Sequence, residues 1–268
     1  MKCRNFLAAV GLLALGQTAI GSTGSESFQR SSERGKTMFL YDRAAWVTSD
    51  DMINRLPADR HREVGGWVVT PTTNGLHVDY FGKDDAANRV VYAADVTDKG
   101  LSNTMIYPSS GEPVLSDIAL KMMLALHAAW REMASHSDWK PCANARFNTI
   151  VLPPEADGSV PVYFLTPQTE TALFPFGGHF EVDVASDGTI SNTRAFTHGC
   201  IALQAPSQDS GSKPAALVIT HLLDPIPTEI HVFEQLYTGV PVFVMTGPKT
   251  VWKVQDGTIV DISAMMKR

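Results

Sequence analysis

The stretch AFTHGC, residues 195–200, contains the residue types from which a cysteine nucleophile is built. Cys200 follows His198 and Gly199, and a second histidine, His179, lies upstream. A histidine near a cysteine can lower the pKa of the thiol and carry its proton, and backbone N–H groups at a glycine turn can stabilise an oxyanion. Cys200 is therefore a candidate nucleophile, unless it is half of a disulfide.

The first 21 residues have the composition of a secretory signal peptide. Two basic residues precede an apolar run over residues 6–15, and the small residues Ala19 and Gly21 stand at the −3 and −1 positions of a signal-peptidase site. The apolar run is short for a bilayer span, and no second long apolar stretch follows. We predict export to the periplasm or the medium, with cleavage near Gly21 and no transmembrane segment in the soluble mature chain.

Removal of this segment leaves two cysteines. Cys3 is lost with the signal peptide, and Cys142 and Cys200 remain. Two cysteines in an oxidising compartment form a disulfide by default. The sequence therefore predicts a Cys142–Cys200 bridge, which would leave no thiolate at Cys200.

A third group of residues could bind a metal ion. The stretch GGHFEVDV places His179, Glu181 and Asp183 on one face of a predicted strand. In THLLDPIPTEIHVF, Glu229 and His231 share a face if TEIHVF is also a strand. Imidazole and carboxylate groups converging from two strands suit zinc or another divalent ion. The alternative is a solvated sheet face without any cofactor. The candidate ligands are His179, His221, His231 and Glu229.

The tetrad THGC, residues 197–200, resembles the signature of the L,D-transpeptidases, which cross-link or attach proteins to bacterial peptidoglycan. His179 upstream and the segment TGVPVFV downstream extend the resemblance. It implies Cys200 as the nucleophile, His179 as the base, and His198 and Gly199 as residues that shape the oxyanion turn. GGHFEVDV and THLLDPIPTEIHVF also resemble stretches of uncharacterised exported bacterial proteins, and that resemblance implies no activity.

The charge of the chain limits its partners. Removal of the signal peptide takes away Lys2 and Arg4, which leaves 20 basic and 28 acidic residues. The net charge of the mature chain is therefore −8. No cluster of lysine and arginine interrupts this acidic sequence. Such a chain is poorly suited to nucleic acid or anionic lipid. We expect no nucleic-acid partner.

The segment patterns predict an α+β fold that is mainly antiparallel sheet. One long amphipathic helix is expected over about 114–136, where apolar residues recur at three- and four-residue steps. Asn74-Gly75, Asp187-Gly188 and Asp256-Gly257 are turn signals between β-rich runs. The segment PTEIHVFEQLYTG fits either a strand or a short helix between Thr228 and Gly239.

The serine-rich residues 22–35 are nearly free of apolar side chains, which predicts a flexible lead-in. Residues 36–268 are expected to form one α+β domain, with a boundary near residue 112 as an alternative.

The leading hypothesis is an exported, soluble, disulfide-bonded protein of the bacterial envelope. A binding or interaction role is as compatible with its sequence as catalysis is, and no activity can be read from it directly. Peptidoglycan peptides or an envelope protein are the candidate partners. The alternatives are a transpeptidase-like cysteine enzyme and a zinc-binding protein.

Overall fold

The computed structural model describes residues 22–83, 88–205 and 216–265, and its strands form three four-stranded sheets and one two-stranded ribbon. All pairs are antiparallel except β11 with β12. The predicted α+β class with mostly antiparallel sheets is confirmed.

The first sheet has the order β1 (Val64–Thr72), β2 (Gly75–Gly82), β3 (Val90–Thr97) and β4 (Gly100–Ile106). The second has the order β5 (Asn148–Val151), β6 (Val160–Leu165), β8 (Phe180–Val184) and β9 (Ile190–Ala195). The third has the order β11 (Leu217–Thr220), β12 (Val242–Gly247), β13 (Thr250–Gln255) and β14 (Thr258–Asp261), and the ribbon pairs β7 (Leu173–Pro175) with β10 (Ala202–Gln204).

Four helices connect and cover these sheets in the described part of the chain: α1 (Ser22–Arg55), the 3-10 helix η1 (Ala58–Glu63), α2 (Asp117–Ser135) and α3 (Glu229–Thr238). The helix expected near 114–136 is α2, which begins where the Ser116 side chain accepts a hydrogen bond from the Ala119 N–H. It is not the one long helix, because α1 has 34 residues. PTEIHVFEQLYTG forms the short helix, with Gly239 at a left-handed φ of 67° after its last residue.

The expectation of a flexible lead-in over residues 22–35 is wrong, because α1 begins at Ser22. Small residues let this polar part of the helix approach α3 and the third sheet closely. A Cβ on Gly35 would lie 2.6 Å from the Glu229 carbonyl oxygen, and the buried Ser32 hydroxyl accepts a hydrogen bond from the Ile259 N–H. Tertiary contacts stabilise this segment without the apolar stripe that marks an amphipathic helix in sequence.

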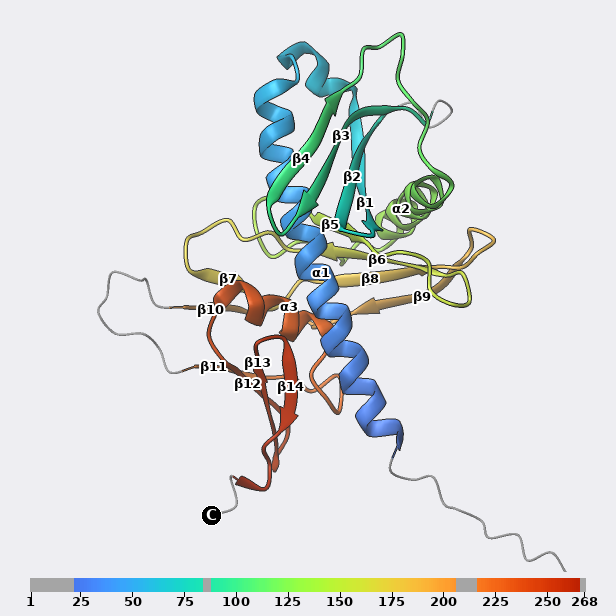
Figure 1. Cartoon of the computed structure of the whole chain (residues 1–268). Helices are drawn as coiled ribbons and strands as arrows, with labels where there is room; N and C mark the ends of the chain where they lie inside the picture. Colours follow the sequence, from blue (N-terminus) through green and yellow to red (C-terminus); the bar gives the residue numbers. More distant parts are fainter. Residues whose placement is uncertain (1–21, 84–87, 206–215, 266–268) are drawn as a thin grey trace, which may run out of the picture.

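From its N-terminal end, helix α1 runs past α3 and the third sheet, then the second sheet and finally the first sheet (Figure 1). The main hydrophobic core lies between the first sheet, α2, the second sheet and α1. It therefore draws residues from both sides of position 112, and a smaller core lies under the third sheet. None of the helices in the described ranges is long and apolar enough to cross a membrane. The predicted signal peptide, residues 1–21, lies outside those ranges.

Candidate functional site

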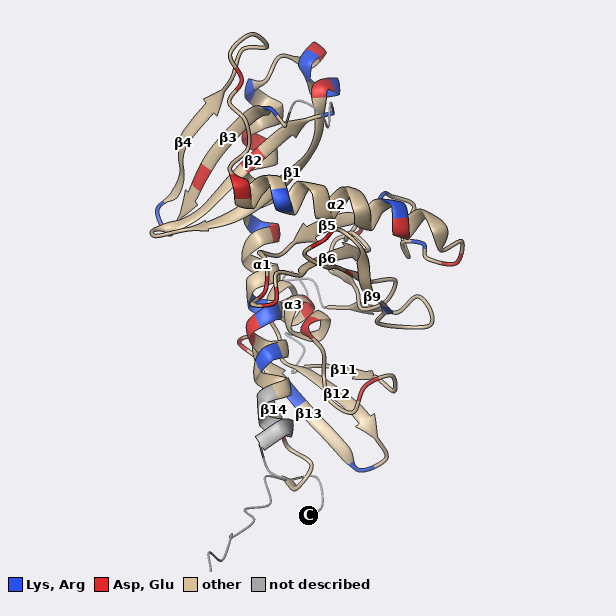
Figure 2. Ribbon diagram, turned by 90° about the vertical axis from the view of Figure 1, so that its right-hand side faces the viewer, with Lys and Arg blue, Asp and Glu red and all other residues tan. Residues whose placement is uncertain are grey.

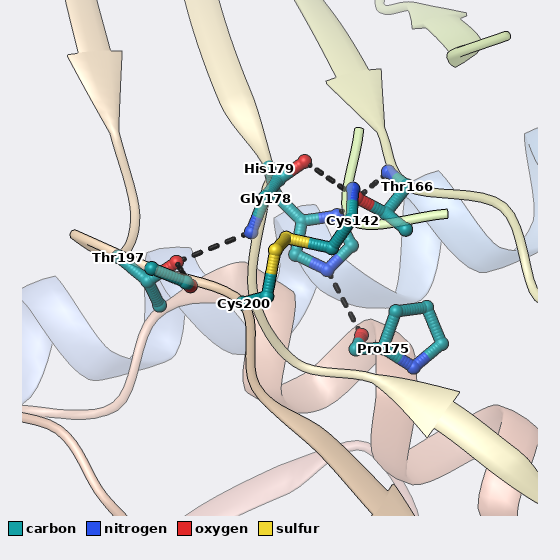
Figure 3. The surroundings of a disulfide bond; sticks show 8 residues. Cys142, Thr166, Pro175, Gly178, His179, Thr197 and Cys200 are labelled. Atoms are coloured by element: carbon teal, nitrogen blue, oxygen red, sulfur yellow. Dashed lines mark hydrogen bonds between the residues drawn. A yellow bond between two sulfur atoms is a disulfide. The ribbon is translucent and has the colours of Figure 1, made fainter. Parts of the chain in front are cut away.

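Cys142 and Cys200 form a disulfide, with their Cα atoms 5.3 Å apart (Figure 3). The bridge joins the loop after α2 to the loop after β9. The prediction of this disulfide is confirmed. Because the Cys200 sulfur is bonded to Cys142, it is not a free thiolate in this structure.

His179 lies beside the disulfide with both ring nitrogens engaged (Figure 3). Its Nδ1 accepts a hydrogen bond of 3.3 Å from the Thr166 N–H, so Nε2 carries the hydrogen and donates to the Pro175 carbonyl oxygen at 2.9 Å. Burial lowers the pKa of His179 to about 4. The ring is therefore neutral at pH 7 and offers no nitrogen to take a proton from a thiol.

His198, the third residue of the transpeptidase-like reading, is exposed in the loop that leads to Cys200. The neighbouring Thr197 hydroxyl donates to the Gly199 carbonyl oxygen at 2.9 Å and accepts from the Gly178 N–H at 3.2 Å. These bonds hold the turn against the strand that carries His179. The structure thus brings Cys200, His198 and His179 into one region, and their contacts are those of a structural junction.

The four candidate metal ligands do not form a common coordination site. His231 closes the capping box of α3, where its Nδ1 accepts from the Thr228 N–H at 3.0 Å. His221 hydrogen-bonds to Asp224 at 2.6 Å, and Glu229 faces Tyr163. Among the residues that the structure describes, no group of three or more His, Cys, Asp or Glu side chains is arranged to hold a metal ion.

The two polar stretches that suggested a metal site meet instead at an open polar cleft of about 390 Å³. GGHFEVDV supplies Glu181 from β8, and THLLDPIPTEIHVF supplies the loop before α3 and its first residue, Glu229. The third wall is the first half of α1, and Figure 2 shows basic and acidic segments close together where α1 passes α3. The residues that line the cleft are Ser27, Arg30, Ser31, Arg34, Glu181, Arg194, Asp224, Ile226, Pro227, Thr228 and Glu229.

The floor of the cleft is a pair of buried carboxyl groups that share one hydroxyl. The Tyr163 hydroxyl lies 2.7 Å from Oε1 of Glu181 and 2.9 Å from Oε1 of Glu229. Arg34 donates from Nη1 to the same Glu181 oxygen at 3.0 Å, and its other terminal nitrogen pairs with Glu155. Nη1 is 3.8 Å from Oε1 of Glu229. The Arg34 guanidinium therefore lies within ion-pair distance of two buried carboxyl groups and of the partly exposed Glu155 carboxylate.

The hydrogen count of this cluster implies a retained proton. A tyrosine hydroxyl has one hydrogen, so both contacts of Tyr163 are full hydrogen bonds only when one carboxyl group is protonated and donates. Burial, and then the charge of Glu229, raise the pKa of Glu181 to about 7, against the hydrogen bond from Tyr163 and the charge of Arg34. Glu181 therefore retains its proton up to about neutral pH, where an ordinary glutamate is ionised.

The rim of the cleft carries a second ionic group and a free cation. Arg194 donates to Asp224 at 2.5 Å, and its guanidinium stacks 4.4 Å from the centre of the Phe196 ring. Although burial raises the pKa of Asp224, the bonds from His221 and Arg194 lower it overall, so Asp224 is ionised at pH 7. Arg30 is exposed on α1 and forms no ion pair with the side chains that the structure describes, which begin at Ser27 on this helix.

Two residues that organise the floor, Arg34 and Tyr163, were not singled out from the sequence. Arg34 falls in the segment expected to be flexible, and Tyr163 lies in an apolar strand where an aromatic residue is ordinary core. The tyrosine and the arginine are recognisable only once α1 lies against β6 and β8. No protein-family model, curated protein or solved structure matches this chain.

Proposed function

We propose that this chain is an exported, disulfide-bonded protein of the bacterial envelope that binds a small dipolar molecule in the Glu181–Glu229 cleft. The ligand class is a molecule with an ammonium group and a carboxylate, such as a short peptide with free ends. The observation that carries the proposal is the pair of buried carboxyl groups at the floor of an open cleft, both close to the Arg34 guanidinium. The exposed Arg30, which pairs with no described side chain, lies at the rim.

The ammonium end belongs at the floor. All hydrogen bonds to the two glutamates use Oε1, and Oε2 of each accepts none from a described residue. Both glutamates line the cleft, so these oxygens are the acceptors that it offers. An ammonium there would replace the retained proton as the compensating positive charge.

The carboxylate end belongs at the rim. The exposed Arg30 guanidinium is a fork-shaped donor suited to a carboxylate. Arg194 is paired with Asp224, whereas Arg30 is exposed and unpaired among the described side chains, so we assign the ligand carboxylate to Arg30. The cleft volume of about 390 Å³ is in the usual range for small-molecule sites.

Export is supported by the signal-like first 21 residues and by the disulfide, which persists in oxidising compartments. Peptidoglycan peptides, the partners suggested by the sequence, carry both required charged groups. Alanyl-alanine is accordingly a suitable first probe.

Isothermal titration calorimetry with the oxidised chain tests the proposal. Alanyl-alanine should bind, and its N-acetyl and C-terminal amide derivatives should bind at least about tenfold more weakly, because each lacks one charge. E229Q and R30A should each weaken binding of the parent dipeptide by about tenfold, and E155Q should change it less than about twofold. Equal binding of all three probes, or no binding of any, would contradict the proposal.

The transpeptidase-like alternative stays a prediction for a chain with a free Cys200. The geometry does not favour it, because His179 already uses both nitrogens in bonds to the backbone. Activity would require release of the Cys200 sulfur and a rearrangement of the His179 ring.

A further inference from the structure

A second pocket, of about 330 Å³, lies on the other half of α1, away from the Glu181–Glu229 cleft. Its walls come from α1, the start of β5, the segment between β6 and β7, and α3. Six of its lining residues define its chemistry: Asp42, Trp46, Asn148, Phe174, Phe233 and Glu234.

The pocket contains a buried carboxyl group without a hydrogen-bond partner in the described chain. Glu234 exposes 3% of its surface and lines the pocket. Nε2 of the neutral His179 ring lies 3.9 Å from its Oε1, and that N–H is directed to the Pro175 carbonyl oxygen. Burial, and then the charge of Asp42, raise the pKa of Glu234 well above its usual range. Glu234 is therefore a neutral acid that can both donate and accept a hydrogen bond.

A second carboxyl group lies at the same pocket in a fixed position. Asp42 accepts hydrogen bonds from the Tyr237 hydroxyl and from the Asn148 amide. These two donors set the orientation of the carboxyl group and leave it further lone pairs. Two carboxyl groups at one small pocket disfavour an anionic ligand, and partners that both donate and accept hydrogen bonds suit hydroxyl groups.

Flat apolar surface completes the pocket. Phe174 and Phe233 line it, and Trp46 lines it while exposing 53% of its surface. The Arg43 guanidinium lies 4.2 Å from the centre of the Trp46 ring and supports the side chain. Such an exposed tryptophan offers a face for the C–H groups of a ring, while the carboxyl groups serve the ring's hydroxyls.

We propose that this pocket binds one ring of a saccharide, with Trp46 against the face of the sugar ring and Glu234 and Asp42 bonded to its hydroxyl groups. The inference does not depend on the Glu181–Glu229 cleft, which takes a different ligand class at a different place. Failure of either proposal leaves the other standing.

Saturation-transfer difference NMR on the full oxidised chain tests this inference, with methyl β-D-glucopyranoside and N-acetylglucosamine as probes. We expect transfer to the ring C–H protons of at least one probe. W46A should weaken binding about tenfold through loss of the stacking surface. E234L should weaken it about tenfold because it removes donor and acceptor together, whereas E234Q keeps both and should stay within about threefold of the parent chain.

W130A is the matched control. Trp130 on α2 also exposes a large part of its ring, 40%, but lies outside the pocket, so this change should leave sugar binding unaltered. If E234L fails to fold, W46A still tests the inference, because Trp46 lies at the surface and its replacement should not unfold the chain. Absence of transfer to both sugars at high millimolar concentration would overturn the inference. Sugar binding by W46A that is as tight as in the parent chain would also overturn it. So would indole that displaces the sugars and receives more saturation transfer than they do.

Discussion

Replacing Glu181 with glutamine removes a proton-binding group from the floor of the cleft while keeping its size and a carbonyl acceptor for Tyr163. The folded-state pKa of Glu181, about 7, lies above its ordinary value of 4.5. Below pH 4.5 the carboxyl group is protonated in both the folded and the unfolded chain, so folding carries no ionisation penalty. Above pH 7 it is ionised in both, and the burial of its charge opposes folding in full.

The size of this effect follows from the two pKa values. A difference between 4.5 and about 7 corresponds to about 3 kcal/mol in the free energy of unfolding. The stability of E181Q relative to the parent chain should therefore increase by about 3 kcal/mol between pH 4.5 and pH 8. Titrating groups that do not contact Glu181 are common to both chains and cancel in the comparison.

Urea denaturation of both oxidised chains at several pH values between 4.5 and 8.5 measures the difference directly. E155Q is the matched control, because Glu155 pairs with the same Arg34 but its side chain is 44% exposed. Its stability relative to the parent should change with pH by less than about 1 kcal/mol. An E181Q difference that stays constant with pH would refute the assignment of the shared proton to this carboxyl group.

Three further perturbations test the surrounding structure. Replacing both cysteines by serine should lower the free energy of unfolding by about 4 kcal/mol, from the entropy of a loop of 58 residues, and a loss below 1 kcal/mol in urea melts would count against the bridge. G35A should cost about 1–3 kcal/mol in the same assay, because the added Cβ would contact the Glu229 carbonyl and Val232 at 2.6 Å; a neutral result would contradict the close α1–α3 packing. Burial lowers the pKa of His231 to about 3, so acidification from pH 7 to 4.5 protonates it only in the unfolded chain, and H231Q should gain about 3 kcal/mol on the parent over that interval. Gln retains an acceptor for the capping box, and a pH-independent difference would show that the histidine is not held neutral.

The features that follow from local sequence were predictable. The three- and four-residue spacing marked α2, and Asp187-Gly188 and Asp256-Gly257 form turns in which each glycine has a positive φ. The disulfide was predicted from the number of cysteines and from the expectation of export. Each of these signals lies within a short window or depends on composition.

The features that depend on distant contacts were not predictable. The first half of α1 is polar, and it is held by Gly35 against α3 and by Arg34 against Glu181, which lies 147 residues away. His179 and Glu229 were singled out as polar positions, but Glu229 is the first residue of helix α3 and not part of a strand. The partners of His179 are Pro175 and Thr166, and the partner of Glu229 is Tyr163; these contacts became visible only in three dimensions.

The proton balance of ligand binding tests the central claim most directly. Titration calorimetry with alanyl-alanine at pH 7, in two buffers of different ionisation enthalpy, counts the protons that binding releases. If the ammonium takes the place of the proton on the Glu181–Glu229 pair, the parent chain should release a measurable fraction of a proton per dipeptide, and E181Q should release almost none. Binding with no proton release, or with the same release from E181Q, would contradict the account.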